Sequence, residues 1–409
     1  MANNNENKIL NVPNLRFPEF SGEWSSQPLT DFMNFKNGLN PDAKRFGRGT
    51  KFISVMDILN NQYICYDNIR ASVELQDGDI ETYGVDYGDI LFQRSSETLE
   101  DVGRANVYLD SKPAIFGGFV IRGKSKGNYN PLFFRYLLAS PTARKRIIVK
   151  GAGAQHFNIG QDGLSKVSLD IPRLSEQEKI GKLLQCVDAR IATQNKIIEK
   201  LQSLIKGLSD NIHRGIKGET VCFSDLGEAY SGLSGKNGGD FGCGEPFITY
   251  MNVYQNTYVS ENDYELVQIA PNEKQNCVRY GDALFTLSSE TPEEVGIGAV
   301  YLGNTQKLYL NSFCFGVHIH DKRVLPRYLA HFIASTSFRK VIYPLAQGST
   351  RFNLQKNDFM KMKFVLPTFE EQECIAKTFD ALLCCLANEK SLVEQYLLLK
   401  QYLLSQMFI

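Results

Sequence analysis

The 409-residue sequence lacks several features that mark a membrane protein or a nucleotide-driven enzyme. Its apolar runs are far shorter than the roughly 20 residues that span a bilayer, and no basic-plus-apolar signal segment opens it. It has no GxxxxGK[ST] phosphate loop, which argues against ATP hydrolysis. Neither Asn40-Pro41 nor Asn130-Pro131 extends into the Asn-Pro-Pro-aromatic signature of an adenine methyltransferase. We therefore expect no membrane association and no nucleotide or methyl-donor site.

Paired cysteines and an excess of charge are also missing. The nine cysteines are odd in number and scattered, without a C-x-x-C pair, so a zinc site is not expected. Reduced thiols of this kind are typical of a cytoplasmic protein. The 45 basic and 45 acidic residues cancel, which excludes nucleic-acid binding by bulk charge alone. A local basic face, or a partner that supplies phosphate contacts, stays possible.

Residues that could perform catalysis are few. Among the five histidines, His318 and His320 share one strand face, but no carboxylate or cysteine completes a metal site around them. An SSET segment contains Ser95 and Ser96, and a second SSET contains Ser288 and Ser289. No histidine stands at a matching place in the two halves, so a turn or cap is favoured over a nucleophile. We expect no catalytic residue and no metal site.

The strongest positive feature is a long internal repeat. YGDILFQRSSETLEDVGRANVYL (87–109) and YGDALFTLSSETPEEVGIGAVYL (280–302) are identical at 15 of 23 positions. Similar pairs follow in the same order, from ASPTARKRI and ASTSFRKVI to GAGAQHFNI and AQGSTRFNL. Each half closes with a proline and a Glu-Gln-Glu run, DIPRLSEQEKI (170–180) and VLPTFEEQECI (365–375). The chain is therefore two copies of one module.

A heptad pattern follows each Glu-Gln-Glu run, as expected for a coiled coil. The first copy places apolar residues at 180, 184, 187, 191, 198, 201, 205, 208 and 212, with Gln194 in register. The second copy has 375, 379, 382, 386, 393, 396, 403 and 407, with Glu389 and Lys400 as interruptions. Helices of about 35–38 residues would be about 55 Å long. A two-helix antiparallel coiled coil is favoured, and two core helices of a larger bundle are the alternative.

The globular halves have an α+β pattern. FISVMDI, DILFQRS and FGGFVIRG are typical of strands separated by turns. YNPLFFRYLLASPTARKRIIV predicts two successive helices, the first starting near Asn128 or Asn130 and the second at Pro141. In the two YGD segments, Gly88 and Gly281 predict a tight turn. We expect the polar residues 1–8 to be disordered.

Two modules that each end in Pro-x-x-x-Glu-Gln and a long helix resemble the specificity subunit of a Type I restriction-modification enzyme. The resemblance rests on RFPEFSGEW (16–24), VDYGDILF, RYGDALF, IPRLSEQEKI, LPTFEEQECI and the terminal LLSQMF, and it covers nearly the whole chain. It implies two repeated globular target recognition domains, separated by two long helices in a pseudo-twofold antiparallel coiled coil. The expected boundaries are 1–173 and 216–367 for the recognition domains, and 174–215 and 368–409 for the spacer helices.

The resemblance implies a non-catalytic subunit that reads a bipartite double-stranded DNA site, one half per module. The spacer helices would set the gap between the half-sites. The partners implied are two methyltransferase subunits and a restriction/translocase subunit. S-adenosylmethionine, ATP and Mg²⁺ would be bound by those partners and not by this chain.

The repeat also sorts the candidate DNA-binding residues. Residues identical in both copies should build the scaffold or a partner surface, whereas base readers should occupy comparable loops and differ. The differing candidates in the first copy are Lys44, Arg45, Arg48, Gln93, Arg94, Gln155 and His156. Their counterparts in the second copy are Lys236, Asn237, Asp240, Thr286, Leu287, Thr350 and Arg351. Four cations recur in both copies and suit phosphate contacts: Arg144, Lys145, Arg339 and Lys340.

Three alternatives remain at this level. The chain could be the recognition subunit of a different multisubunit restriction enzyme. It could be an adaptor that holds two protein-binding modules on a coiled coil. It could be a hydrolase that uses Ser96 and Ser289.

Overall fold

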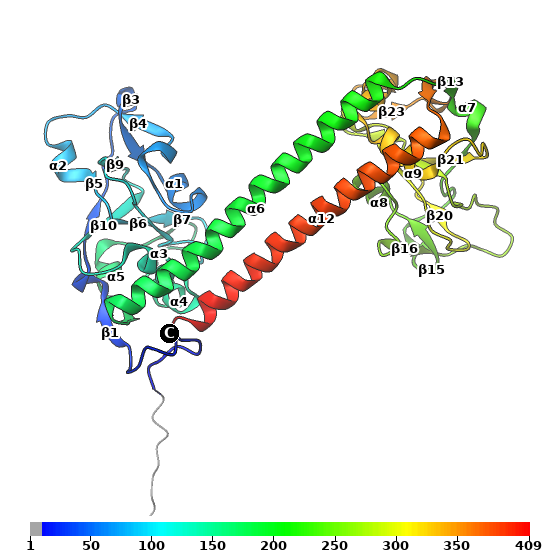
Figure 1. Cartoon of the computed structure of the whole chain (residues 1–409). Helices are drawn as coiled ribbons and strands as arrows, with labels where there is room; N and C mark the ends of the chain where they lie inside the picture. Colours follow the sequence, from blue (N-terminus) through cyan, green and yellow to red (C-terminus); the bar gives the residue numbers. More distant parts are fainter. Residues whose placement is uncertain (1–9) are drawn as a thin grey trace, which may run out of the picture. The chain divides into compact units, whose positions relative to one another are not determined.

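The computed structural model describes residues 10–409, so the segment 1–8 that was expected to be disordered lies outside the described residues. The described chain divides into two units. The first contains the chain up to Asn195 together with Ser391–Ile409, and the second is Lys196–Lys390. The C-terminal segment therefore belongs to the same unit as the N-terminal module (Figure 1).

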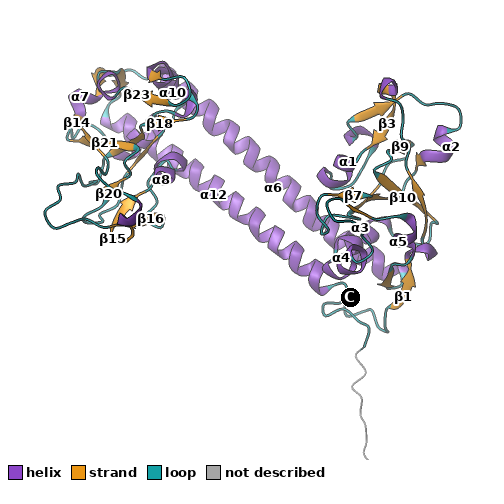
Figure 2. Ribbon diagram, turned by 180° about the vertical axis from the view of Figure 1, so that it is seen from behind, coloured by secondary structure: helices purple, strands orange, loops and turns teal. Residues whose placement is uncertain are grey.

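The first unit is built on two four-stranded sheets (Figure 2). One has the order β2 (Met33–Asn37), β10 (Val120–Ser125), β6 (Ile90–Gln93) and β8 (Ala105–Val107). The other has the order β4 (Ala71–Val73), β3 (Phe46–Ile53), β9 (Ala114–Phe116) and β5 (Gly84–Val85). Two short pairs complete it: β1 (Ser25–Pro28) with β12 (Ser168–Ile171), and β7 (Ser95–Ser96) with β11 (Phe157–Asn158).

The second unit repeats this plan. Its four-stranded sheet has the order β14 (Gly227–Ser231), β21 (Cys314–Ile319), β17 (Ala283–Thr286) and β19 (Gly298–Val300), which matches the order in the first unit. A three-stranded sheet contains β16 (Tyr264–Val267), β15 (Phe241–Ile248) and β20 (Tyr309–Leu310). The remaining strands are β13 (Glu219–Cys222) with β24 (Lys363–Leu366), and β18 (Ser288–Ser289), β23 (Phe352–Leu354) and β22 (Ala346–Gln347).

Short helices cover these sheets. In the first unit they are α1 (Val55–Asn60), α2 (Asp79–Tyr83), α3 (Pro131–Ala139), α4 (Pro141–Ile148) and α5 (Gln161–Ser165). In the second they are α7 (Phe223–Leu226), α8 (Tyr250–Gln255), α9 (Pro326–Ile333), α10 (Thr336–Ile342) and α11 (Lys356–Met360). The expected start of α3 is confirmed, because the Asn130 side chain accepts a hydrogen bond from the Phe133 amide at 2.9 Å. The start of α4 at Pro141 is confirmed as well.

The two long helices are α6 (Leu174–Gly215) and α12 (Phe369–Gln406). The heptad prediction is confirmed, because every predicted seam position is at least half-buried, including Gln194, Glu389 and Lys400. Most positions between the seams are exposed along the middle of α6, which excludes helices buried on all sides in a bundle. Within the first unit, Lys400 of α12 bonds Asp188 of α6 at 2.6 Å. Because late residues of one helix meet early residues of the other, the helical segments run antiparallel.

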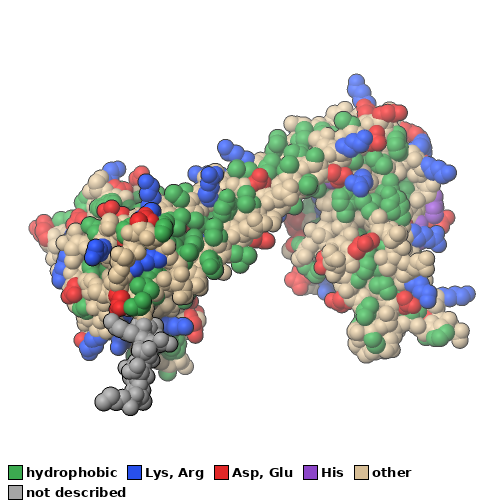
Figure 3. Space-filling model, turned by 60° about the horizontal axis from the view of Figure 1, so that its bottom comes forward, with side chains coloured by type: hydrophobic (Ala, Val, Ile, Leu, Met, Phe, Trp, Pro, Cys, Tyr) green, Lys and Arg blue, Asp and Glu red, His purple; other side chains and the backbone are tan. Residues whose placement is uncertain are grey.

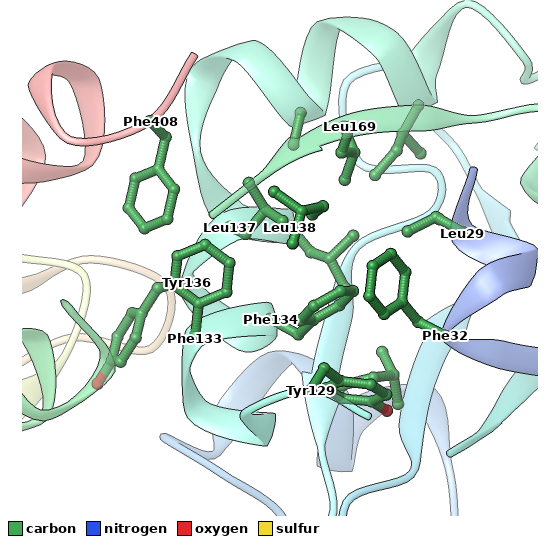
Figure 4. Close-up of a cluster of buried hydrophobic side chains, with 14 of the residues drawn as sticks. Leu29, Phe32, Tyr129, Phe133, Phe134, Tyr136, Leu137, Leu138, Leu169 and Phe408 are labelled. Atoms are coloured by element: carbon green, nitrogen blue, oxygen red, sulfur yellow. The ribbon is translucent and has the colours of Figure 1, made fainter. Parts of the chain in front are cut away.

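The core of the first unit draws on both ends of the chain. Leu29, Phe133 and Phe134 are fully buried at its centre, and Phe408 joins them from the residues after α12 (Figure 4). The Phe408 ring lies 5.5 Å from the ring of Phe133 and 6.5 Å from that of Trp24. The LLSQMF ending is therefore a core element of the first module.

The repeated Glu-Gln run joins each long helix to its module. Gln177 donates to the Pro172 carbonyl at 3.0 Å and accepts from the Asn130 amide at 3.0 Å. Gln372 makes the same pair of contacts, with the Pro367 carbonyl at 3.0 Å and the Leu325 amide at 2.8 Å. The repeated glutamine thus fixes the start of each helix against its own module.

Candidate nucleic-acid interface

Two equivalent loop tips present four of the differing candidates. The tips are residues 153–156 and 348–351, and Gln155, His156, Thr350 and Arg351 are exposed on them. Each loop leads into a short strand that pairs with the SSET segment, β11 with β7 and β23 with β18. The loops therefore stand on the same frame in both units.

A glycine fixes the geometry of each tip. Gly153 has φ +144° and Gly348 has φ +142°, a backbone conformation that side chains disfavour. A Cβ atom there would lie 2.0 Å from the carbonyl oxygen of His156 or Arg351. The loop shape is thus constant between the copies while the exposed side chains change, which is what a reading element on a shared scaffold requires.

In the second unit the tip borders a hollow of about 320 Å³. The Arg351 guanidinium lies 5.9 Å from the centroid of the Phe313 ring, within cation–π range. The hollow is lined by aromatic, hydroxyl and acidic side chains from α8, the SSET segment and the loops: Tyr250, Met251, Tyr254, Ser288, Ser289, Glu290, Glu294, Phe313 and Arg351. These side chains together offer stacking surfaces, hydrogen-bond acceptors and a cation.

Hydrogen bonds hold the acidic wall of this hollow. Glu294 accepts from the Tyr254 hydroxyl at 2.7 Å and from Ser289 at 2.9 Å. These bonds lower the pKa of the Glu294 carboxyl, so it is charged at neutral pH. Ser289 therefore orients a carboxylate, and in the first unit Ser95 bonds Asn158. The SSET hydroxyls take part in turn structure, as expected.

Two of the basic candidates in the long loops are occupied by ion pairs. Arg45 is bonded to Asp79 and donates to the Glu74 carbonyl at 2.9 Å, and its side chain is mostly buried. Lys236 bonds Glu273 at 2.6 Å and the Gln268 carbonyl at 2.6 Å, and it helps to lower the pKa of Glu273 to about 2. Both side chains stabilise their loops, and this argues against base contacts by either.

The other candidates in these loops lie at the surface. Arg48 pairs with Glu74 at 2.7 Å while both side chains stay exposed. Lys44 is exposed. Asn237 caps a short turn by accepting from the Gly239 amide at 3.0 Å, and the Asp240 carboxylate accepts from the Asn237 amide at 2.8 Å. Lys44 and Arg48 therefore remain available to a ligand, whereas Asn237 and Asp240 shape their loop.

The strand candidates point into the protein. Gln93 is buried and donates to the Ser95 carbonyl at 2.9 Å, and Thr286 is fully buried. Arg94 is half-buried and donates to the Gly118 carbonyl at 3.3 Å, while Leu287 is half-buried and packs on the core. Every position of β6 and of β17 is buried, so both faces of these strands are covered, and Gln93 and Thr286 are buried with their neighbours.

The four recurring cations separate into two kinds. Arg144 donates to the carbonyls of Glu100 at 2.8 Å and Val102 at 2.7 Å, and Arg339 makes equivalent bonds to Glu293, Val295 and Gly296. Burial lowers the pKa of both guanidinium groups, that of Arg144 to about 10. Both brace the SSET loop with these bonds, while Nη1 of Arg144 has no hydrogen-bond partner. Lys145 and Lys340 are exposed.

Several exposed apolar residues were missed from the sequence. Phe119 and its counterpart Phe313 are 69% and 53% exposed, and Met56 and Met251 are also exposed. Tyr250 and Tyr254 line the hollow of the second unit, where the first copy has Val55 and Leu59. For Tyr250 and Tyr254, the sequence difference between the two copies was the signal that could have identified them. They were missed because apolar residues on an amphipathic helix are usually assigned to the hydrophobic core.

The described residues 10–409 contain no group of three or more His, Cys, Asp or Glu side chains placed to hold a metal ion. Over the same residues, none of the helices has both the length and the apolarity needed to cross a membrane. The free cysteines include five that are exposed and one, Cys314, that is buried.

Comparison with known proteins identifies the architecture. The family model described as "Type I restriction modification DNA specificity domain" matches residues 21–203 and again 225–395. Two curated relatives come from Methanocaldococcus jannaschii. The chain is 23% identical to the putative type I restriction enzyme MjaX specificity subunit, covering 92% of this chain and 90% of that protein. It is 22% identical to the MjaVIII specificity subunit, covering 95% and 93%.

Solved structures show the same fold. A Type-I restriction-modification system S subunit from M. genitalium aligns with a TM-score of 0.56 at 12% identity, over 97% of this chain and 99% of that one. A chain from a structural study of the assembly and conformational transition of the type I R-M system aligns with a TM-score of 0.60 at 13% identity, over 93% and 96%. The α+β fold with two modules and two long helices is therefore that of S subunits.

Proposed function

Because the chain belongs to the Type I restriction modification DNA specificity family, we propose that its two units read the two halves of a bipartite DNA site. It is a specificity subunit with two target recognition domains. The observation that carries the proposal is that the same strand-and-loop scaffold occurs in both units, while the side chains at the two loop tips differ. The Gly153 and Gly348 loops have the same backbone geometry, whereas the side chains they present differ.

The candidate readers follow from exposure. His156 and Gln155 in the first unit, and Arg351 and Thr350 in the second, are free to approach a base edge. Arginine can bond guanine in a bidentate manner, and glutamine can do the same with adenine. Lys44, Arg48, Lys145 and Lys340 suit phosphate contacts that position the modules without reading sequence.

The long helices are proposed to set the gap and to bind methyltransferase subunits. Hydrophobic side chains are visible on the surface of the helical segments (Figure 3). On α12, within the first unit, they include four largely exposed residues: Leu397, Leu398, Leu399 and Tyr402. A concentration of exposed apolar side chains of this kind is typical of a protein-binding face. Shortening residues 180–212 by one heptad should then change the gap length that is methylated, and an unchanged gap would count against the spacer role.

The chain itself is proposed to carry out no chemistry, and S-adenosylmethionine, ATP and Mg²⁺ to be bound by methyltransferase and restriction subunits. The SSET hydroxyls support this, because Ser96 and Ser289 bond groups of their own turns and Ser95 bonds Asn158 of the paired strand β11. A complex of this kind would work where the chromosome is, in the cytoplasm.

Adenine-methylation mapping tests the proposal. Cells that express this chain with its methyltransferase subunit should acquire a two-part methylated motif with a fixed gap. Cells that express the methyltransferase subunit alone should lack it. A stable complex that leaves the methylation pattern unchanged would contradict the proposed reading function.

A further inference from the structure

A cation-lined hollow in the first unit is not accounted for by DNA reading at the loop tips. It has a volume of about 520 Å³ and lies among α1, β8, α3, α4 and the last turns of α12. Five basic side chains line it, and we call it the basic hollow: Arg104, Arg135, Arg144, Lys145 and Lys400. All of them belong to the first unit.

The carboxylates around the basic hollow do not balance these cations. Asp188 is shared, since it bonds Lys400 at 2.6 Å and pairs with Arg135 at 3.4 Å. It also accepts from the Tyr136 hydroxyl, which points away from the aromatic cluster in Figure 4. Asp101 pairs with Arg104 at 2.6 Å, and Glu100 is the acidic residue of the lining. Five cations therefore face three carboxylates, which leaves two positive charges.

Two guanidinium nitrogen atoms at the basic hollow have no hydrogen-bond partner. They are Nε of Arg135 and Nη1 of Arg144, and both are buried. A buried donor without a partner is costly, and a water or anion bound at the basic hollow would satisfy these two nitrogen atoms. Burial and the neighbouring Arg104 lower the pKa of Arg144 to about 10, an effect that a bound anion would reverse.

The second unit lacks two of these cations. Its equivalent hollow has about 260 Å³ and is lined at repeat-equivalent positions by His331 and Ala334 in place of Tyr136 and Ala139. Lys206 is the one lysine in that lining, which has no arginine. The counterparts of Arg104 and Arg135 are Ile297 and Ala330. Arg104 and Arg135 are therefore specific to the first copy, whereas Arg144 and Lys145 recur as Arg339 and Lys340.

We propose that the basic hollow binds a phosphate group. Two uncompensated charges match a phosphate dianion, and arginine forks match its oxygen atoms. The volume lies within the range of about 300–1,000 Å³ that is usual for small-ligand sites. The phosphate can belong to a free nucleotide or to the DNA backbone, and a separate measurement tests each of these two sources.

The test uses the chain in complex with its methyltransferase subunits and compares two double variants. R104Q/K145Q removes two exposed cations of the basic hollow and leaves the Asp188 pairs intact. K322Q/K361Q removes two exposed cations of the second unit that have no proposed DNA contact, and it serves as the matched control. Calorimetric titration with pyrophosphate, without DNA and at fixed ionic strength, measures binding of a free phosphate ligand. The salt dependence of DNA binding measures contact with the phosphates of DNA.

Pyrophosphate binding that weakens at least about tenfold in R104Q/K145Q, with no change in the control, supports a free phosphate ligand. If pyrophosphate does not bind but the slope of log K against log salt falls by about one to two in R104Q/K145Q alone, the phosphate is that of DNA. Absence of both effects overturns the proposal. Because pyrophosphate is tested without DNA, failure here is separable from failure of the proposed reading function.

Discussion

The two units use one repeated motif in partly different ways. Gln177 and Gln372 make the same two backbone bonds, but the glutamates that precede them differ. Glu176 is buried and accepts from Arg16 at 2.7 Å and from the Trp24 indole at 3.3 Å. Glu371 is exposed and bonds the amide of Thr368, where α12 starts, at 3.1 Å. Identity between the copies therefore marks a shared scaffold position, but the local partners decide what each residue stabilises.

The two units also differ in which part of the chain completes their hydrophobic cores. The first unit takes Leu403, Met407 and Phe408 from the C-terminal end of the chain into its core. The core of the second unit is closed by residues of its own segment, including a stacked pair of rings, Phe223 and Phe359, at 4.8 Å. Perturbations at the C-terminus should thus act on one unit only.

Truncation of the C-terminal anchor should have the largest effect. Phe408→Ala removes a buried ring next to Trp24 and Phe133, and a change of this kind costs about 3–5 kcal/mol. Hydrogen exchange of the complex should show faster exchange in residues 10–195 and little change in 220–365. Gln401→Ala, at an exposed position near the end of α12, is the control. Equal loss of protection in both units would contradict the assignment of the C-terminal segment to the first unit alone.

The glutamate pair should give the next largest difference. Glu176→Gln leaves the mostly buried Arg16 without its carboxylate and should cost roughly 3–5 kcal/mol. Glu371→Gln changes an exposed cap and should cost less than about 1 kcal/mol. Denaturant midpoints of the two variants test this ranking. Equal shifts would mean that the Arg16 and Trp24 contacts add no stability.

Substitution at a loop tip should change one half-site. Arg351→Ala should weaken recognition of the second unit's half-site by about 1–3 kcal/mol, since a bidentate base contact has that magnitude. Methylation of oligonucleotides with single changes in either half measures it, with Lys322→Ala as the exposed-cation control. A uniform loss over both halves would reassign Arg351 to phosphate contact.

Mild acid should distinguish the units by a smaller effect. Burial lowers the pKa of His213 and of His331, both in the second unit, although Asp380 partly offsets the shift at His331. The unfolded chain binds these protons more readily, so their contribution is complete above pH about 6.5 and is lost as the pH falls below it. The first unit contains one histidine, the exposed His156. Hydrogen exchange at pH 7.0 and 5.5 should therefore show selective loosening of the second unit, and His331→Gln should reduce the loss.

Much of this fold follows from the sequence, because period and repetition are local signals. The seams, the start of α3 and the paired YGD turns, with Gly88 at φ +90° and Gly281 at φ +86°, were predicted. The placement of Phe408 beside Trp24 was not, since the two positions are nearly 400 residues apart and no local pattern joins them. The site was predicted less well. Four of the candidates are cations, the residue type expected of DNA contacts: Arg45, Arg144, Lys236 and Arg339. Their partners are instead carboxylates and backbone carbonyls that only the folded chain brings near them.

The claim that each module reads its own half-site is tested most directly by exchanging one module. Residues 38–160 would be replaced by the corresponding segment of a specificity subunit with a different target, and adenine methylation would be mapped in cells that express the methyltransferase subunit. The account predicts a motif in which one half is new, while the other half and the gap are unchanged. A change in both halves, or in neither, would contradict it.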